Sequence, residues 1–195
     1  MTGFGNMDKI VYGAWIVFIL YWLVSAMNVK REVPDAKSAI GRSFSLVRIV
    51  IAVALTSLFP TAITRVFGAS LGSPRDAMIR MAGAALTIGG VLFAIWARSH
   101  LGRNWSGHPA LKEDHELVTS GPYGFIRHPI YTGMLTASIG SMFATVESFW
   151  LYFFFIMAIA FVYRIHVEEG IMMRTFPDDY PQYRKHTNAL IPFIW

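Results

Sequence analysis

The sequence predicts an all-α, polytopic integral membrane protein with about five transmembrane helices. Hydrophobic residues make up 54% of the 195 residues and charged residues only 15%, whereas soluble domains contain roughly 25% charged residues. The mean hydropathy is +0.45. A water-soluble core of this size cannot bury so much apolar surface, and a bilayer is therefore the expected environment.

Five apolar runs underlie this prediction, and each approaches the roughly 20 residues that cross the hydrocarbon core of a bilayer. They cover Lys9–Met27, Phe44–Thr64, Met78–Ala97, Pro129–Ala144 and Phe149–Arg164. The last two runs are so close together that we expect a tight antiparallel hairpin. No linker divides the chain, so we expect one domain over 1–195, with three spans in 1–97 and most polar residues in 98–195.

The distribution of cations predicts the orientation of these spans. Five spans place the 28–43 loop, the 98–128 loop and the C-terminal tail on one face of the membrane, and most cations follow this division: Lys30, Arg31, Lys37, Arg42, Arg98, Arg103, Lys112, Arg127, Arg164, Arg174, Arg184 and Lys185. The positive-inside rule makes that face cytoplasmic. Because the cations are scattered between apolar runs, the net charge of +5 indicates anionic headgroups rather than nucleic acid as the partner.

Small residues within the spans predict where helices pack closely. Gly133 with Ala137 and Ala85 with Gly89 recur at four-residue spacing, which lets helices approach one another in lipid. We expect these positions to serve packing rather than chemistry.

Several classes of chemistry leave no trace in the sequence. It contains no cysteine, no His-Glu-x-x-His pattern and no three-ligand metal spacing. It also lacks GxGxxG after a strand, a Walker loop and a GxSxG elbow. We therefore expect neither a metal site nor a Rossmann cofactor domain.

Polar residues gather first in the segment that leads into the fourth span. A Ser-Gly-Pro turn precedes Pro129, which suits the first position of a helix. Arg127 and His128 then lie beside the free amides of a helix N-terminus, where anions bind readily. Two interpretations remain open from the residues alone: a binding pocket bracketed by Tyr123 and Tyr131, or a helix cap that touches lipid phosphates.

A second polar stretch follows the fifth span. Arg164 and Glu168 are four residues apart and share one helix face. Ionisable groups at that depth usually pair with each other or line a polar cavity, and a purely structural ion pair is the other open interpretation. His166 and Glu169 are expected to point elsewhere on the helix.

At RHPIY, followed by Glu168-Glu169 after the last apolar run, the sequence resembles the isoprenylcysteine carboxyl methyltransferase family, and more closely its small prokaryotic members. This family belongs with the membrane phospholipid methyltransferases. The resemblance covers roughly Leu101 to Trp195 through the segments LGRNWS, HELVTSGPYGFIRHPIY, RIHVEEGIMMRTFPDDYPQYRKHT and LIPFIW.

The resemblance implies a carboxyl O-methyltransferase that uses S-adenosyl-L-methionine and releases S-adenosyl-L-homocysteine. The cofactor pocket would lie on the cytoplasmic face, in the half 98–195. Arg164 would bind the substrate and would be catalytic together with Glu168, while His108 stands where the animal enzymes have Gln and can still hydrogen-bond the cofactor. The other positions implied to bind the cofactor are His115, Glu116, Leu117, Val118, Tyr123, His128, Pro129, Ile130, Tyr131 and Glu168.

These roles agree with the chemistry of the side chains. We expect the cofactor's carboxylate near His128 at the start of the fourth span, its ammonium or ribose hydroxyls at Glu168, and its adenine against Leu117 and Val118. All of this requires that the loop before the fourth span and the far end of the fifth converge on one pocket.

The expected substrate is a lipophilic, prenylcysteine-like carboxylate that enters from the bilayer and leaves as a methyl ester. Membrane lipids are the other expected partners. The nearest alternative is a phospholipid N-methyltransferase, whose amine would need a base such as His128 or a tyrosine. A membrane reductase that uses NADPH and a non-enzymatic membrane interaction protein are the remaining alternatives.

Overall fold

The computed structural model describes residues 4–27, 74–105, 116–145 and 147–190. Within them, α1 (Phe4–Ala26), α4 (Pro74–Leu101), α5 (Pro129–Thr145) and α6 (Ser148–Thr175) are long helices, and α7 (Asp179–His186) is short. Two 3-10 turns, η1 (Gly102–Asn104) and η2 (Gly121–Gly124), connect them. The described residues form no sheet and contain one isolated bridge, between Ile126 and Asn188. The predicted span 44–64 lies outside the described residues.

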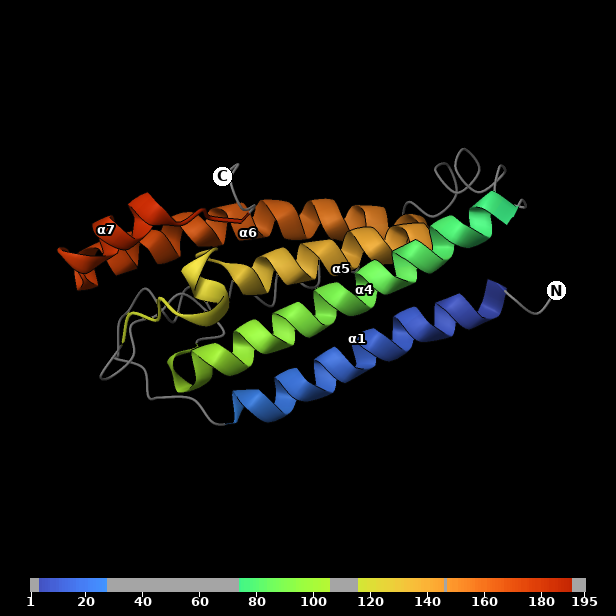
Figure 1. Ribbon diagram of the computed structural model, residues 1–195, viewed down its shortest axis with the longest axis horizontal. Helices are drawn as coiled ribbons and strands as arrows, with labels where there is room; N and C mark the ends of the chain where they lie inside the picture. Colours follow the sequence, from blue (N-terminus) through green and yellow to red (C-terminus); the bar gives the residue numbers. More distant parts are fainter. Residues whose placement is uncertain (1–3, 28–73, 106–115, 146, 191–195) are drawn as a thin grey trace.

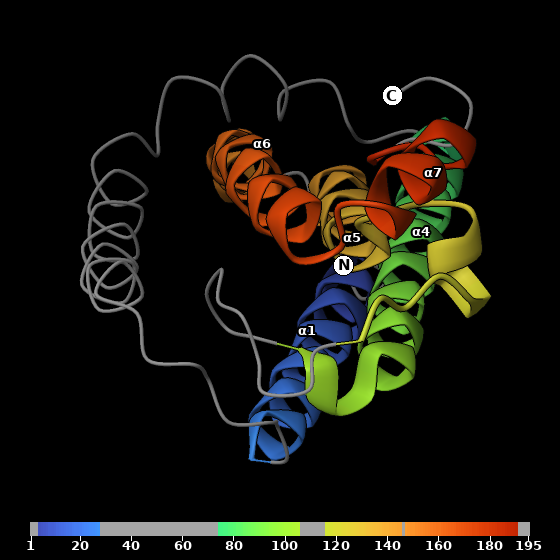
Figure 2. The same cartoon turned by 90° about the vertical axis from the view of Figure 1, so that its left-hand side faces the viewer.

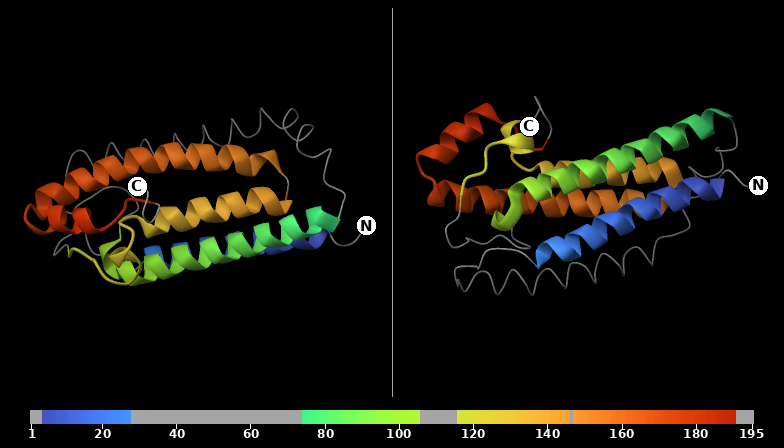
Figure 3. Two further views of the ribbon diagram at one scale, coloured as in Figure 1. Left: turned by 45° about the horizontal axis from the view of Figure 1, so that its top comes forward. Right: turned by 60° about the horizontal axis from the view of Figure 1, so that its bottom comes forward.

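The long helices run side by side along the longest axis of the molecule, with α5 between α4 and α6 (Figures 1 and 2). α1 and α4 run in the same direction, because Arg80 contacts Asp8 at one end of the bundle (3.0 Å) and Arg98 donates to the carbonyl of Ser25 at the other (2.7 Å). The five-span prediction requires this parallel pair. Figure 3 shows α7, coloured red, beside the last part of α6.

The chain is an integral membrane protein. Three of the described helices are long and apolar enough to cross a bilayer, over Asn6–Ala26, Ala77–Asn104 and Phe149–Thr175. Large apolar side chains on their outer faces are exposed, such as Leu20 and Val24 on α1, where acyl chains can solvate them. α5 has 17 residues, or about 25 Å at 1.5 Å per residue, and most of its surface is covered by the neighbouring helices.

Glycines allow α4 and α5 to approach almost to backbone contact. A Cβ added at Gly90 would lie 2.5 Å from the backbone nitrogen of Ala137 and 2.6 Å from the carbonyl oxygen of Gly133. Seven residues after Gly133 on α5, a Cβ added at Gly140 would lie 2.5 Å from the backbone nitrogen of Thr87 on α4. Small residues at such crossings gain dispersion contacts that larger side chains would prevent.

The predicted packing positions are therefore right on α5 and wrong on α4. Gly133 and Ala137 lie in the contact, as expected, but Ala85 and Gly89 are exposed and a Cβ at Gly89 would meet nothing within 4 Å. The four-residue spacing is present on two faces of α4, and only the face that carries Gly90 meets α5. The predicted hairpin of α5 with α6 is formed, although the closest approach of α5 is to α4.

α6 continues well beyond the predicted end of the last span. Its apolar run ends near Arg164, but the helix extends to Thr175. Arg164 and Glu168 therefore lie within a continuous helix rather than at its end. The extension carries α6 past the start of α5 and provides one wall for the polar end of the bundle.

The contact between α4 and α5 gives the first prediction. We expect Gly90→Ala to lower the free energy of unfolding by about 1–3 kcal/mol, because the added methyl group forces two backbones apart. The matched control is Gly89→Ala, one residue away on the exposed face, which should be neutral or stabilising because alanine favours the helix. Thermal unfolding in detergent measures both. Equal midpoints for the two variants would contradict the packing described here.

Candidate active site

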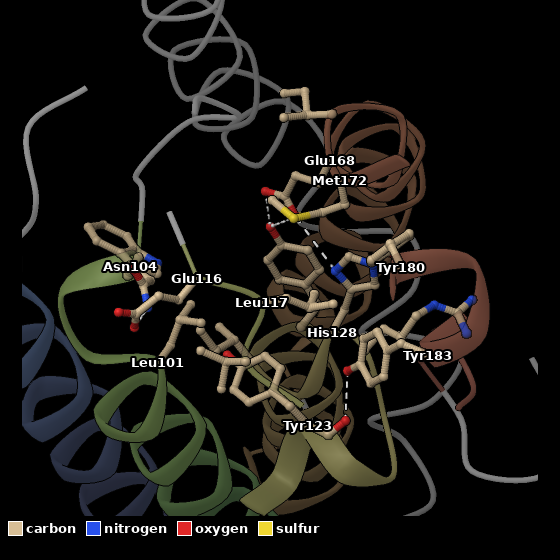
Figure 4. A pocket seen from close by; sticks show the side chains of 16 residues that line it. Leu101, Asn104, Glu116, Leu117, Tyr123, His128, Glu168, Met172, Tyr180 and Tyr183 are labelled. Atoms are coloured by element: carbon tan, nitrogen blue, oxygen red, sulfur yellow. Dashed lines mark hydrogen bonds and ion pairs between the residues drawn. The ribbon is translucent and has the colours of Figure 1, made fainter. Parts of the chain in front are cut away.

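A cavity of about 150 Å³ opens at the end of the bundle where α4 stops and α5 begins. Figure 4 shows side chains from several elements pointing into it. The lining residues are mostly aliphatic and aromatic, with a few polar groups: Leu101, Asn104, Trp105, Glu116, Leu117, Val118, Tyr123, Arg127, His128, Ile130, Tyr131, Glu168, Ile171, Met172, Tyr180 and Tyr183. An apolar cavity with a few convergent polar groups is the usual form of a small-molecule site.

Glu168 is the polar centre of this cavity. The hydroxyl of Tyr131 lies 2.7 and 2.9 Å from its two carboxylate oxygens. Arg164 Nε donates to Oε1 from one turn earlier on α6 (2.9 Å), and His128 Nδ1 lies 3.5 Å from Oε2. A carboxylate with this set of partners is held ionised and in a fixed orientation.

An aromatic stack fixes the groups around Glu168. The rings of His128 and Tyr131 are parallel within 2°, with centroids 5.5 Å apart. Phe161 of α6 stacks on the other face of Tyr131 at 4.3 Å. Both faces of Tyr131 are thus covered, and its hydroxyl has little freedom to leave Glu168.

Glu169 forms a second charged group on the adjacent face of α6. Arg127 Nε donates to it at 2.7 Å, and Arg184 of α7 lies 3.3 Å away. His128 Nε2 is 3.5 Å from the same carboxylate. His128 therefore lies between two carboxylates, one at each ring nitrogen.

The position of His128 shifts its pKa. Burial alone would lower the pKa of the imidazole, but the two carboxylates outweigh burial and hold the pKa above its ordinary value. The nearby tyrosines keep their protons as well. Burial raises the pKa of Tyr123 and raises the pKa of Tyr183 to about 12.

The C-terminal segment holds the loop before α5 in place. The backbone amides of Arg127 and His128 donate to the carbonyls of Asn188 (2.8 Å) and Ala189 (3.0 Å), and Arg127 Nη1 donates to the carbonyl of Thr187. Tyr183 of α7 donates to the carbonyl of Tyr123 at 2.7 Å. The residues after α6 therefore build the site together with the residues before α5.

These contacts describe the surroundings of the expected anion site at the start of the fourth span. We predicted that the free amides of that helix, which follow Arg127 and His128, would hold the cofactor's carboxylate, and this stays a prediction. The backbone amides of Arg127 and His128 themselves are hydrogen-bonded to residues after α7, and the anions beside the two side chains are the protein's own Glu168 and Glu169. A buried cation needs such a fixed counter-charge inside the fold.

Most of the predicted site residues lie together at the cavity. Of the described ones, these line it: Glu116, Leu117, Val118, Tyr123, His128, Ile130, Tyr131 and Glu168. Pro129 is buried at the start of α5 but does not line the cavity. Arg164 does not line it either, but it contacts Glu168 and Tyr131, which do. His108 and His115 lie outside the described residues.

Sequence reasoning missed several members of the site. Glu169 and His166 were expected to point elsewhere on the helix. Glu169 does not line the cavity but contacts Arg127 and His128, which do, and His166 is exposed and contacts the carbonyl of Val162. Asn104, Tyr180 and Tyr183 were not singled out, although each falls within a segment that carries the family resemblance. Within the described ranges, no three His, Asp or Glu residues are grouped as metal ligands.

Comparisons with known proteins point to one family. Residues 83–174 match the model of the isoprenylcysteine carboxyl methyltransferase (ICMT) family. The chain is 37% identical over 84 residues to a protein-S-isoprenylcysteine O-methyltransferase of Schizosaccharomyces pombe, covering 42% of this chain and 35% of the relative. It is also 33% identical over 114 residues to the nickel-cobalt-cadmium resistance protein NccN of Alcaligenes xylosoxydans xylosoxydans, covering 56% of this chain and 50% of that protein.

Comparison of the fold with solved structures points to the same family. A solved structure of the eukaryotic intramembrane Ras methyltransferase ICMT superposes with a TM-score of 0.59 at 25% identity, over 75% of this chain and 53% of that one. The chain thus spans about a third of the fission-yeast relative and about half of the solved chain. The matched region contains α5, most of α4 and nearly all of α6, which provide much of the cavity wall. Across residues 83–174 the chain therefore resembles the isoprenylcysteine carboxyl methyltransferase family in both sequence and fold.

Proposed function

We propose that this protein is an S-adenosylmethionine-dependent carboxyl O-methyltransferase that acts on a prenylcysteine-like C-terminus. The observation that carries the proposal is the pair formed by Glu168 and Arg164. Glu168 lines a largely apolar cavity, and Arg164 donates to it from one turn earlier on α6. One carboxylate for a cationic ligand and one guanidinium for an anionic substrate thus lie within hydrogen-bonding distance of each other.

The residues of the cavity suit S-adenosylmethionine. Glu168 offers carboxylate oxygens to an ammonium or to ribose hydroxyls. Leu117, Val118 and Ile130 provide apolar surface for a purine ring. When bound, this cofactor supplies a methyl group on a sulfonium, ready for transfer to a nucleophile.

Arg164 is proposed to orient the substrate. Its guanidinium cannot lose its proton at physiological pH and therefore binds a carboxylate without acting as a base. Nearby on the same helix, Ile159 and Tyr163 are exposed by 72% and 62%. This lipid-facing surface offers a route by which a prenyl chain can bring its carboxylate to Arg164 from within the bilayer.

The protonation states around the cavity favour a carboxylate nucleophile over an amine. A carboxylate is already ionised at neutral pH and attacks without losing a proton, whereas an amine needs a base. The raised pKa values of His128, Tyr123 and Tyr183 mean that the proton-free form of each side chain is less populated than it ordinarily is. The rate would then come from alignment of the reacting atoms and from exclusion of water.

The same end of the bundle is proposed to face the cytoplasm. Arg98, Arg103, Arg127, Arg174 and Arg184 lie at the ends of α4 and α6, in α7 and in the loop before α5. The opposite end carries fewer cations among the described residues, and there Arg80 is paired with Asp8. This asymmetry follows the positive-inside rule.

Methyl transfer from labelled S-adenosylmethionine tests the proposal directly. The purified protein in detergent is offered a farnesylcysteine analogue or phosphatidylethanolamine. We expect label on the prenylcysteine only, in a form released by mild base, because esters are base-labile and N-methyl groups are not. Base-stable label on the phospholipid would establish the alternative reaction. Stabilisation by NADPH but not by S-adenosylhomocysteine would point to the reductase.

Arg164 and Glu168 should separate catalysis from cofactor binding. We expect Arg164→Ala to lower methyl transfer about 100-fold or more, with the Kd of S-adenosylhomocysteine changed only a few-fold. Glu168→Gln should raise that Kd about tenfold, because a neutral amide attracts the ligand's ammonium less strongly than a carboxylate does. Isothermal titration calorimetry and the methyl-transfer assay give the two readouts.

Arg174→Ala is the matched control for the loss of one arginine from α6, since Arg174 is exposed in the last turn of the helix. Arg174→Ala should leave both the rate of methyl transfer and the Kd of S-adenosylhomocysteine unchanged. Wild-type cofactor affinity in Glu168→Gln would remove Glu168 from the binding site.

His128 should make stability depend on pH in a defined direction. Because its pKa in the folded protein is raised, the stabilisation it provides is complete below about pH 6.5, the ordinary value. That stabilisation is lost as the pH rises through the raised pKa. The gap in melting temperature between wild type and His128→Gln should therefore be largest on the acidic side and shrink at alkaline pH.

His166→Gln, at an exposed position of α6, is the control for the loss of a histidine. A gap for His128→Gln that widens with increasing pH would show that the imidazole is buried in its neutral form.

A further inference from the structure

We propose that Asn104 binds the adenine edge of the adenosyl ligand and so fixes which end of the cavity receives the nucleoside. The inference rests on the proposed function and assigns the orientation of its cofactor. Asn104 is 9% exposed, lines the cavity, and its Oδ1 atom is buried without a hydrogen-bond partner in the described part of the chain.

A buried amide oxygen without a partner is uncommon in folded proteins. Asn104 Nδ2 donates one hydrogen to Glu116 Oε2 at 3.4 Å. An amide nitrogen carries two hydrogens, so the carbonyl oxygen and the second N–H form an adjacent acceptor and donor. Because the side chain lines the cavity, a ligand is the natural partner for this pair.

The two polar regions of the cavity lie on different walls. In Figure 4, Asn104 and Glu116 are on one side, Glu168 and His128 are on the other, and Leu117 lies between them. An elongated ligand that spans the cavity would therefore place a different polar group in each region. S-adenosylmethionine has this form, with a charged amino-acid end and a neutral nucleobase.

The chemistry of the two regions decides which end goes where. The amino-acid end carries full charges and matches the ionised cluster around Glu168 and His128. Adenine presents an amino group beside a ring-nitrogen acceptor, and a carboxamide pairs with that edge through one accepted and one donated hydrogen bond. Asn104 offers this pair of atoms, which the charged region does not.

The backbone around Asn104 is held firmly. The preceding Gly102 has a φ of +56°, a conformation that glycine adopts without strain. Arg98, which is 2% exposed, donates to the carbonyls of Gly102 and Ser25, both at 2.7 Å, and its guanidinium lies 4.5 Å from the ring centroid of Trp105. Arg98 is thus a positioning residue that presents Asn104 at a fixed place in the wall.

A comparison of two bases tests the assignment. Calorimetry would measure the Kd of S-adenosylhomocysteine and of S-inosylhomocysteine, in which the adenine amino group is replaced by a carbonyl oxygen. We expect the wild type to prefer the adenine ligand about tenfold or more, and Asn104→Leu to reduce this preference to near one. Glu168→Gln should weaken both ligands equally and keep the preference.

Asn104→Leu also separates a ligand contact from a structural role. Leucine fills a similar volume and removes the unpartnered Oδ1 at the loss of one long hydrogen bond to Glu116. The melting temperature should therefore stay the same or rise while adenine recognition is lost. A lower melting temperature with the base preference intact would assign Asn104 to structure instead. Asn6→Ala, at an exposed position of α1, controls for the loss of an asparagine.

A third ligand locates the other end of the cofactor. 5′-Methylthioadenosine contains the nucleoside but lacks the amino-acid group. With the ligand's ammonium rather than its ribose at Glu168, its affinity should fall in Asn104→Leu and be unaffected in Glu168→Gln. If the wild type binds neither adenosyl ligand, both the inference and the proposed function are wrong. If it binds them and Asn104→Leu keeps the wild-type preference, only the assignment of the adenine end is overturned.

Discussion

The end of the bundle that holds the cavity depends on the neutralisation of buried charge. Two adjacent carboxylates of α6 face different partners: Glu168 meets Tyr131 and Arg164, and Glu169 meets Arg127 and Arg184. His128 lies between them. Where water is scarce, a charge left without its partner is costly. The loop before α5, the helix α6 and the residues around α7 must therefore come together, and the cavity wall results from their meeting.

The same constraint surrounds the start of α5 with the protein's own anions. A helix N-terminus with two cations beside it would attract a ligand carboxylate in isolation. In the folded chain, carbonyls from residues 187–189 take the neighbouring backbone and side-chain donors, and α6 supplies the anions. Among the described residues, the polar groups that line the cavity include Glu168, His128 and, on the opposite wall, Asn104.

Methyl transfer to a carboxylate suits a site of this kind. The reaction needs no group that removes a proton, and burial and nearby anions raise the pKa values of the histidine and tyrosines His128, Tyr123 and Tyr183. The site instead holds the groups around the cavity in fixed positions. Three contacts hold the walls of the cavity in place: the close glycine contact of α4 with α5, the stack of Phe161 on Tyr131, and the hydrogen bond from Arg98 to Gly102.

The sequence by itself determined the apolar runs that became α1, α4, α5 and α6, the helix start at Pro129, and the shared face of Arg164 and Glu168. These features are local: hydropathy adds up along a span, proline fits a first helical turn, and a four-residue step returns to one helix face. The tertiary structure alone decided that Gly90 rather than Gly89 meets α5, that Glu169 pairs with Arg127 and Arg184, and that Asn104 faces Glu168 across the cavity. Periodicity shows which residues share a face, but the partner of that face comes from segments distant in sequence, and only packing selects it.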